Sequence, residues 1–261
     1  MTEVLAKHAE RDDWSRHWDA YARAVSENPA QRMRHKLILS TISRMPGKVE
    51  FLLDVGSGQG DFLQGAASSN AAGQLVGFEL SGVGVAISQA KVPEATFIQA
   101  DLLNPPETLR EYEGKADVAV CSEVIEHVDN PVIFLQSLRN YLKPGGLLIL
   151  TVPGGPMSAF DRHIGHRKHF SAKSTASTLQ MARFSVENIQ LAGFPFFNLY
   201  RLTVILRGKR LIDDVKAGPS DGRPSTLTTL GMRLFQFLFK WNSNDSPLGW
   251  QVIALARKHG S

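Results

Sequence analysis

Between residues 49 and 152, short apolar runs alternate with longer segments of mixed polarity. Continuous apolar runs are typical of parallel strands that helices cover on both faces. The segments between them are predicted to be helices, and Ser81 is a suitable N-cap for one of them. The alternation predicts a doubly wound α/β sheet built from right-handed βαβ units. The strands are expected at 49–55, 74–78, 95–99, 116–121 and 146–152, and the helices at 61–70, 81–91 and 131–142.

The two ends of the chain depart from this alternation. Residues 14–45 are predicted to be helical, and Trp14, Trp18 and Tyr21 share one helix face. After Pro153 we expect a loop rich in glycine and histidine, then a helix, a strand and a last strand, at 154–171, 171–183, 184–191 and 250–257. The predicted units are an N-terminal helical cap (1–47), a core (48–195 plus 246–258) and a helical insertion before the last strand (196–245).

Composition and charge are those of an ordinary soluble globular protein. Of the 261 residues, 43% are hydrophobic and 21% charged, and the formal net charge is +4. The basic residues are scattered rather than gathered in a stripe, which favours a solvated surface and argues against a nucleic-acid partner. The one cysteine, Cys121, excludes an internal disulfide and agrees with a reducing compartment. No apolar signal core or transmembrane segment is apparent, so we expect a cytoplasmic protein.

A glycine-rich turn follows the first predicted strand. Gly56, Gly58 and Gly60 lack the Cβ that would keep a cofactor away from the backbone. A dinucleotide fold would place its third glycine at position 61, but Asp61 stands there and would crowd a diphosphate. The pattern therefore favours a cofactor other than a dinucleotide. The alternative is a tight turn with only a structural role.

Three carboxylates stand at the ends of three successive predicted strands: Asp54, Glu79 and Asp101. Glu79 is placed to accept hydrogen bonds from ribose hydroxyls, and Asp101 from an adenine amino group. Each one alone also fits a helix cap or a surface charge. Three in register at one sheet edge favour a nucleoside-binding site.

The order and spacing of these motifs resemble the class I S-adenosylmethionine-dependent methyltransferases, in style the small-molecule O-methyltransferases of ubiquinone biosynthesis. The resemblance covers about residues 50–195 and also rests on the runs at 121–128 and 142–153. It implies a Rossmann-like seven-stranded sheet whose last strand is antiparallel, with S-adenosylmethionine as cofactor and S-adenosylhomocysteine as product. One departure is that Glu79 replaces the commoner aspartate, and glutamate can serve the same role.

The resemblance also implies roles for individual residues. Gly56, Gly58 and Gly60 would lie beneath the methionine part of the cofactor, with Asp54 supporting their loop. The remaining implied contacts are Glu79 at the ribose, Asp101 and the Leu102 amide at the adenine, and Ser122 and Glu123 beside the sulfonium, with Ser57 and Leu80 completing the cofactor site.

Methyl transfer from a sulfonium needs a base only if the acceptor is protonated at neutral pH, as a hydroxyl is. His127, after the fourth strand, and His166 and His169, after the fifth, are the candidate catalytic residues. The alternatives are a histidine that braces the loop, a substrate lid, and a metal site formed by Asp161 with His163, His166 and His169. We assign no residue to a metal.

We therefore predict an enzyme that methylates a small molecule, at oxygen rather than nitrogen. A nitrogen or macromolecular acceptor and a non-catalytic S-adenosylmethionine-binding protein remain as alternatives. The cap and the insertion are expected to cover the acceptor, with Phe196, Phe197 and Tyr200 as an aromatic wall. The apolar helix at 226–241 is expected to be buried or to form a homodimer contact; a membrane surface is the alternative.

Overall fold

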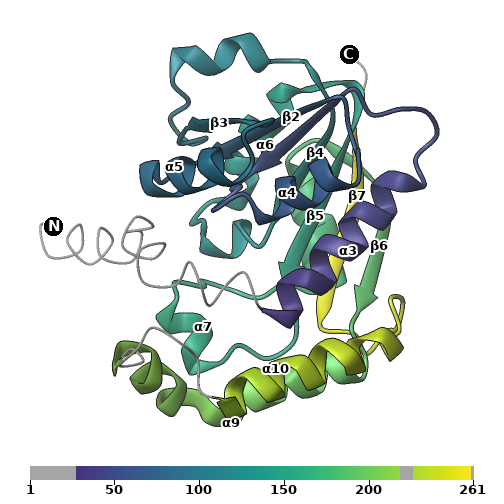
Figure 1. Ribbon diagram of the computed structural model, residues 1–261. Helices are drawn as coiled ribbons and strands as arrows, with labels where there is room; N and C mark the ends of the chain where they lie inside the picture. Colours follow the sequence, from purple (N-terminus) through teal and green to yellow (C-terminus); the bar gives the residue numbers. More distant parts are fainter. Residues whose placement is uncertain (1–27, 218–225, 260–261) are drawn as a thin grey trace, which may run out of the picture.

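The computed structural model describes residues 28–217 and 226–259, which contain one seven-stranded sheet with helices on both faces (Figure 1). The strand order is β3-β2-β1-β4-β5-β7-β6. Trp14, Trp18 and Tyr21 lie outside the described residues. The strands are β1 (Phe51–Val55), β2 (Gln74–Glu79), β3 (Thr96–Gln99), β4 (Ala116–Ser122), β5 (Leu142–Pro153), β6 (Phe184–Ala192) and β7 (Gln251–Lys258).

The first five strands are parallel, and β7 runs antiparallel to both of its neighbours, β5 and β6. This confirms the predicted fold class and the antiparallel last strand. Strand β7 lies between β5 and β6. The chain therefore forms the edge strand β6 before it forms the inner strand β7.

Each face of the sheet carries its own apolar core because successive strand residues point to opposite faces. In β1, Leu52 belongs to the core under α3 and α4, whereas Leu53 belongs to the core under α6 and α8. Both side chains are fully buried. The helices of these layers are α3 (Pro29–Ser43), α4 (Asp61–Ser68), α5 (Gly82–Lys91), α6 (Pro131–Tyr141) and α8 (Ala172–Met181), with a 3-10 turn η1 (Glu107–Tyr112) beside them.

We predicted a loop over residues 154–171. This prediction was wrong in part, because the segment contains the short helix α7 (Ala159–His163). Ser158 and Asp161 form a capping box that starts this helix: each side chain accepts a hydrogen bond from the backbone N–H of the other. The sequence signal was therefore present in the spacing of these two residues. A 3-10 turn, η2 (Ile125–His127), likewise follows β4.

The segment 196–245 contains helices α9 (Phe196–Ala217) and α10 (Thr226–Leu238) and the 3-10 turn η3 (Phe239–Trp241). In Figure 1 they form, with α7, a separate layer at one end of the sheet. Helix α10 packs on α3 and α9, and α9 packs on α7. None of the helices within residues 28–217 and 226–259 has the length and apolar character needed to cross a bilayer.

Candidate active site

A cavity of about 520 Å³ opens at the carboxyl ends of the parallel strands. This is where ligands bind in open α/β sheets, and the volume suits a small organic molecule. Helices α3 and α9 form the opposite wall. Ten of the eleven predicted cofactor residues line the cavity; they are Asp54, Gly56, Ser57, Gly58, Glu79, Leu80, Asp101, Leu102, Ser122 and Glu123, while Gly60 lies just behind.

The turn after β1 has a conformation that requires glycine. Gly56 and Gly60 have φ angles of +75° and +79°, in the left-handed region. A Cβ at Gly56 would stand 2.4 Å from a methyl group of Val124, and one at Gly60 2.8 Å from the Cβ of Ser88. The turn thus keeps its backbone close to its neighbours and open toward the cavity.

Glu79 joins this turn to the end of β2. Its Oε2 accepts a hydrogen bond from the backbone N–H of Gly58 at 2.8 Å, and its Oε1 accepts one from that of Ser81 at 2.9 Å. The side chain is buried yet lines the cavity. Because each carboxylate oxygen has two acceptor sites, Glu79 keeps capacity for a ligand hydroxyl.

Asp54 lies beneath the same turn and is also buried. Burial raises the pKa of its carboxyl to about 8, and the negative charge of Glu79 contributes to the rise. The group is therefore largely neutral at pH 7. A neutral carboxyl at this place suits a bracing role better than a charged contact.

The carboxylates of Asp101 and Asp61 are both engaged within the protein. Asp101 accepts hydrogen bonds from the backbone N–H of Leu103 at 2.9 Å and from the side-chain amide of Asn104 at 3.0 Å. Asp61, on α4, pairs with Lys91 of α5 at 2.7 Å. Asp101 thus shapes its own turn at the cavity edge, and Asp61 ties two helices together.

At the end of β4, Glu123 is held by several partners. One oxygen accepts hydrogen bonds from Thr151 at 3.1 Å and Gln251 at 2.9 Å, and the other lies 3.6 Å from the guanidinium of Arg34. Ser122 bonds the same threonine hydroxyl at 2.8 Å. Arg34 and Gln251 were missed in the sequence, because nothing local in α3 or β7 relates them to β4.

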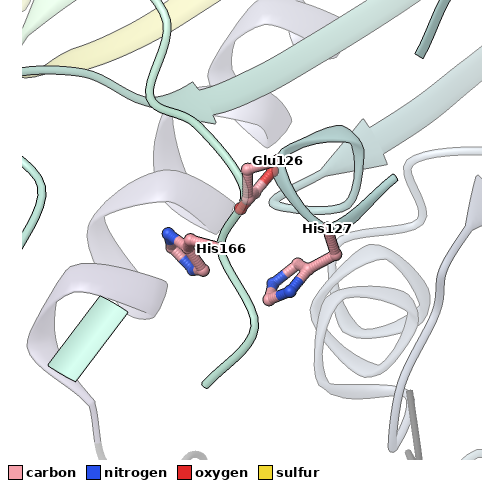
Figure 2. Close-up of side chains that lie close together, drawn as sticks. All are labelled: Glu126, His127 and His166. Carbon is pink, nitrogen blue, oxygen red and sulfur yellow. The ribbon is translucent and has the colours of Figure 1, made fainter. Parts of the chain in front are cut away.

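Two of the three candidate catalytic histidines line the cavity together. The rings of His127 and His166 meet edge to face with centroids 4.6 Å apart (Figure 2). Burial lowers the pKa of His166 to about 4, so its ring is neutral at pH 7. His169 does not line the cavity but lies behind His166, where burial also lowers its pKa. His163 is exposed.

A fourth group, Glu126, completes this end of the cavity and was not among the predicted site residues. It is fully buried. Burial raises its pKa well above the usual range, and the charge of Glu123 raises it further. The only sequence signal was its position next to His127, after the fourth strand.

Helix α9 contributes Phe197, Tyr200 and Arg201 to the cavity wall, whereas Phe196 is not part of it. Arg201 donates two hydrogen bonds to Asp161 of α7, at 3.0 and 2.7 Å. Burial alone would raise the pKa of Asp161, but the bonds to Arg201 and its charge outweigh burial and lower the pKa to about 2. Asp161 is therefore ionised and already paired.

The glycine turn, the acidic strand ends and this strand order define the class I S-adenosylmethionine-dependent methyltransferases. The chain belongs to the methyltransferase-domain family, whose sequence profile matches residues 30–206. A methyltransferase domain of this class takes its methyl group from S-adenosylmethionine. The cavity fits that cofactor, because its backbone-lined turn and the buried Glu79 provide the close approach and the hydroxyl acceptor that an adenosyl ligand needs.

Curated proteins with similar sequences are also methyltransferases. The ubiquinone biosynthesis O-methyltransferase of Leptothrix cholodnii is 27% identical over 57% of this chain and 64% of its own length. That of Shewanella halifaxensis is 29% identical over 44% of this chain and 49% of its own length. This chain thus spans about half to two thirds of these curated relatives.

Solved structures share the fold at low identity. The [4+2]-cyclase SpnF superposes with a TM-score of 0.57 at 20% identity, over 86% of this chain and 80% of its own. Phosphoethanolamine N-methyltransferase 2 of Haemonchus contortus, solved with S-adenosylmethionine, has a TM-score of 0.55 at 18% identity, over 87% of this chain and 52% of its own.

Proposed function

We propose that this enzyme transfers the methyl group of S-adenosylmethionine to a hydroxyl oxygen of a small molecule. The observation that carries the proposal is the cavity itself, which runs from the glycine turn to the paired rings of His127 and His166. The similarity to ubiquinone biosynthesis O-methyltransferases supports oxygen as the acceptor atom.

We assign the glycine-turn end of the cavity to the cofactor. Glu79 would bind the ribose with its remaining acceptor capacity, and the Leu102 amide with Asp101 would bind the adenine. Ser122 and Glu123 would flank the sulfonium, where the carboxylate of Glu123 suits a positive charge. Gly56, Ser57, Gly58, Gly60 and Leu80 would enclose the remaining surface, with Asp54 bracing the turn.

The histidine end is assigned to the acceptor. S-adenosylmethionine supplies an activated methyl group, so the chain has to align the acceptor oxygen with it and exclude water. The acceptor oxygen forms the new bond to carbon, the carbon–sulfur bond breaks, and the hydroxyl proton leaves. His127 and His166 would take that proton or orient the hydroxyl, and His169, whose Nε2 lies 3.2 Å from the Nδ1 of His166, would hold His166 in position.

The units outside the sheet would enclose the acceptor. The helical insertion at 196–245 supplies Phe197, Tyr200 and Arg201 to the cavity wall, which supports its assignment as a cover over the acceptor site. The described part of the cap at 1–47 supplies Arg34 and His35 from α3. A partly apolar wall of this kind suits an acceptor with an apolar or aromatic body.

Helix α10 has a face that the other described residues leave exposed. Leu230, Leu234, Phe237 and Trp241, on α10 and the turn after it, recur at helical spacing and are more than half exposed. A contiguous apolar face of this kind is typical of an interface. We propose that a second copy of this chain covers it.

Calorimetric titration of the purified chain with S-adenosylmethionine, S-adenosylhomocysteine and NAD tests the cofactor assignment. Both adenosyl ligands should bind and NAD should not. Glu79→Ala should weaken adenosyl binding about tenfold or more, because a charge-assisted hydrogen bond is worth about 1.5–3 kcal/mol. The exposed Glu94→Ala is the matched control. Unchanged affinity in Glu79→Ala would contradict the ribose assignment.

The acceptor atom is tested by offering phenols and alcohols alongside amines of matched shape and following methyl transfer from labelled S-adenosylmethionine. We expect methylated hydroxyl compounds. Methylation confined to the amines would overturn the oxygen assignment while leaving the cofactor assignment intact.

A further inference from the structure

Glu126, His127 and His166 form a cluster of metal-ligating side chains inside the cavity, although 39 to 40 positions of sequence separate His166 from the other two. One ligand atom from each lies within 4.8 Å of those of the other two. Figure 2 shows the carboxylate and the two rings lying together. Bonds to one ion of about 2.0–2.2 Å place its ligands about 3–4 Å apart, so small side-chain rotations would close the cluster.

Within this cluster, Glu126 has a buried carboxylate without a hydrogen-bond partner in the described part of the chain. Its side chain is 0% exposed, and within residues 28–217 and 226–259 neither carboxylate oxygen has a hydrogen-bond partner. Burying a carboxylate without a partner is costly, and buried charges are ordinarily paired or coordinated to a metal. Glu123, three residues earlier, is by contrast supplied with partners.

A chain of hydrogen bonds fixes which nitrogen of His166 faces the cluster. The Gly155 carbonyl can only accept, so the Nδ1 of His169, 3.1 Å away, must donate. The Nε2 of a neutral His169 then accepts from the Nδ1 of His166 at 3.2 Å. His166 is left with a lone pair on Nε2, the form that a metal requires. Such outer partners are typical of metal-binding histidines.

A neighbouring group of potential ligands, Asp161 with His166 and His169, is less suited to a cation. Both oxygens of Asp161 accept hydrogen bonds from the guanidinium of Arg201, which already neutralises the carboxylate. His169 is likewise committed to Gly155 and His166. Of these two clusters, the one around Glu126 is therefore better suited to a cation, because the carboxylate oxygens of Glu126 have no hydrogen-bond partner among the described residues.

We propose that Glu126, His127 and His166 bind a divalent transition-metal ion at the acceptor end of the cavity. Two imidazoles and one carboxylate are the donor set of ions such as Mn²⁺, Fe²⁺, Co²⁺ and Zn²⁺ rather than of Mg²⁺, which prefers oxygen ligands. Three protein ligands leave coordination positions open toward the cavity.

The open positions give the ion a role that rests on the proposed function. An acceptor hydroxyl bound there would be oriented and would lose its proton more readily, because a cation stabilises the oxygen anion. His127 and His166 would then act on the acceptor through the ion, and His169 would be a positioning residue for His166.

The test is to treat the untagged chain with a chelator to remove bound metal and then titrate it with Mn²⁺ and Co²⁺. Paramagnetic resonance counts free Mn²⁺, and the visible absorption of Co²⁺ reports its ligand geometry. We expect one ion per chain and weaker binding of Mg²⁺. Glu126→Gln and His166→Ala should each weaken binding at least about 100-fold, and His169→Ala about 10- to 100-fold.

His163→Ala, an exposed histidine of the same segment, is the matched control and should bind as the wild type does. Thermal melting and S-adenosylhomocysteine affinity show that each variant is folded. No stoichiometric binding by the wild type, or full affinity in Glu126→Gln, would overturn the site. Because the titration needs no acceptor, its failure is distinguishable from failure of the oxygen assignment. Methyl transfer unaffected by removing the ion would contradict the acceptor role.

Discussion

At the scale of single residues, burial controls the charge states around the cavity. His35, on α3, packs its ring edge to face on Phe62 with centroids 5.5 Å apart. Burial lowers the pKa of His35 to about 3, and the neighbouring charge of Arg34 contributes. The folded protein therefore holds this ring neutral where the unfolded chain would protonate it.

This difference predicts a pH dependence of stability. The folded pKa lies below the unfolded value of about 6.5, so the contribution is fully present above pH 6.5 and is lost as the pH falls toward 3. In that window His35 adds a slope of at most about 1.4 kcal/mol per pH unit to the free energy of unfolding. His35→Gln should lack that part of the slope.

Urea unfolding at several values between pH 7.5 and 4.5 measures the slope. The exposed His259→Gln serves as the control and should retain the wild-type slope. Equal slopes for the wild type and His35→Gln would mean that His35 is not held neutral by the fold.

At the scale of elements, the layer over the cavity is held by a buried ion pair. Asp161 of α7 is 1% exposed and Arg201 of α9 is 14% exposed at the side chain, and the two hydrogen bonds between them join these helices. Removing one partner of such a pair leaves the other charge buried and uncompensated, which is strongly destabilising.

We therefore expect Arg201→Leu to lower the free energy of unfolding by about 3 kcal/mol or more. The double variant Asp161→Asn with Arg201→Leu should be less destabilised than the sum of its single variants, because it removes the stranded charge. Denaturant unfolding of all four proteins completes the cycle. Additive effects would show that the pair does not couple α7 to α9.

At the scale of the whole molecule, we expect the exposed apolar face of α10 to mediate association of two chains. If a second copy covers it, light scattering after gel filtration should give about twice the 28.7 kDa of one chain. Leu234→Lys with Phe237→Lys should restore the single-chain mass, because two charges would oppose burial of that face. Met181→Lys, at a residue 56% exposed on α8, is the control. A monomeric wild type would contradict the homodimer.

The sequence by itself determined the features that neighbouring residues decide. The apolar runs at β1, β2 and β4 are read from a short window, because a strand covered on both faces must be apolar at nearly every position. The glycines at 56 and 60 are likewise local, since only glycine tolerates their backbone angles beside Val124 and Ser88. The carboxylate of Glu79 was placed correctly at a strand end.

Only the tertiary structure decided which distant segments meet. The sequence did not place β7 between β5 and β6, did not bring Glu126 to His166, and did not pair Arg201 with Asp161. It also did not show that His169 would stand behind His166 rather than in the cavity. The physical reason is that the periodicity of apolar residues along a segment predicts which side chains are buried. Which residues meet across the cavity depends instead on how the whole sheet and its helices pack together.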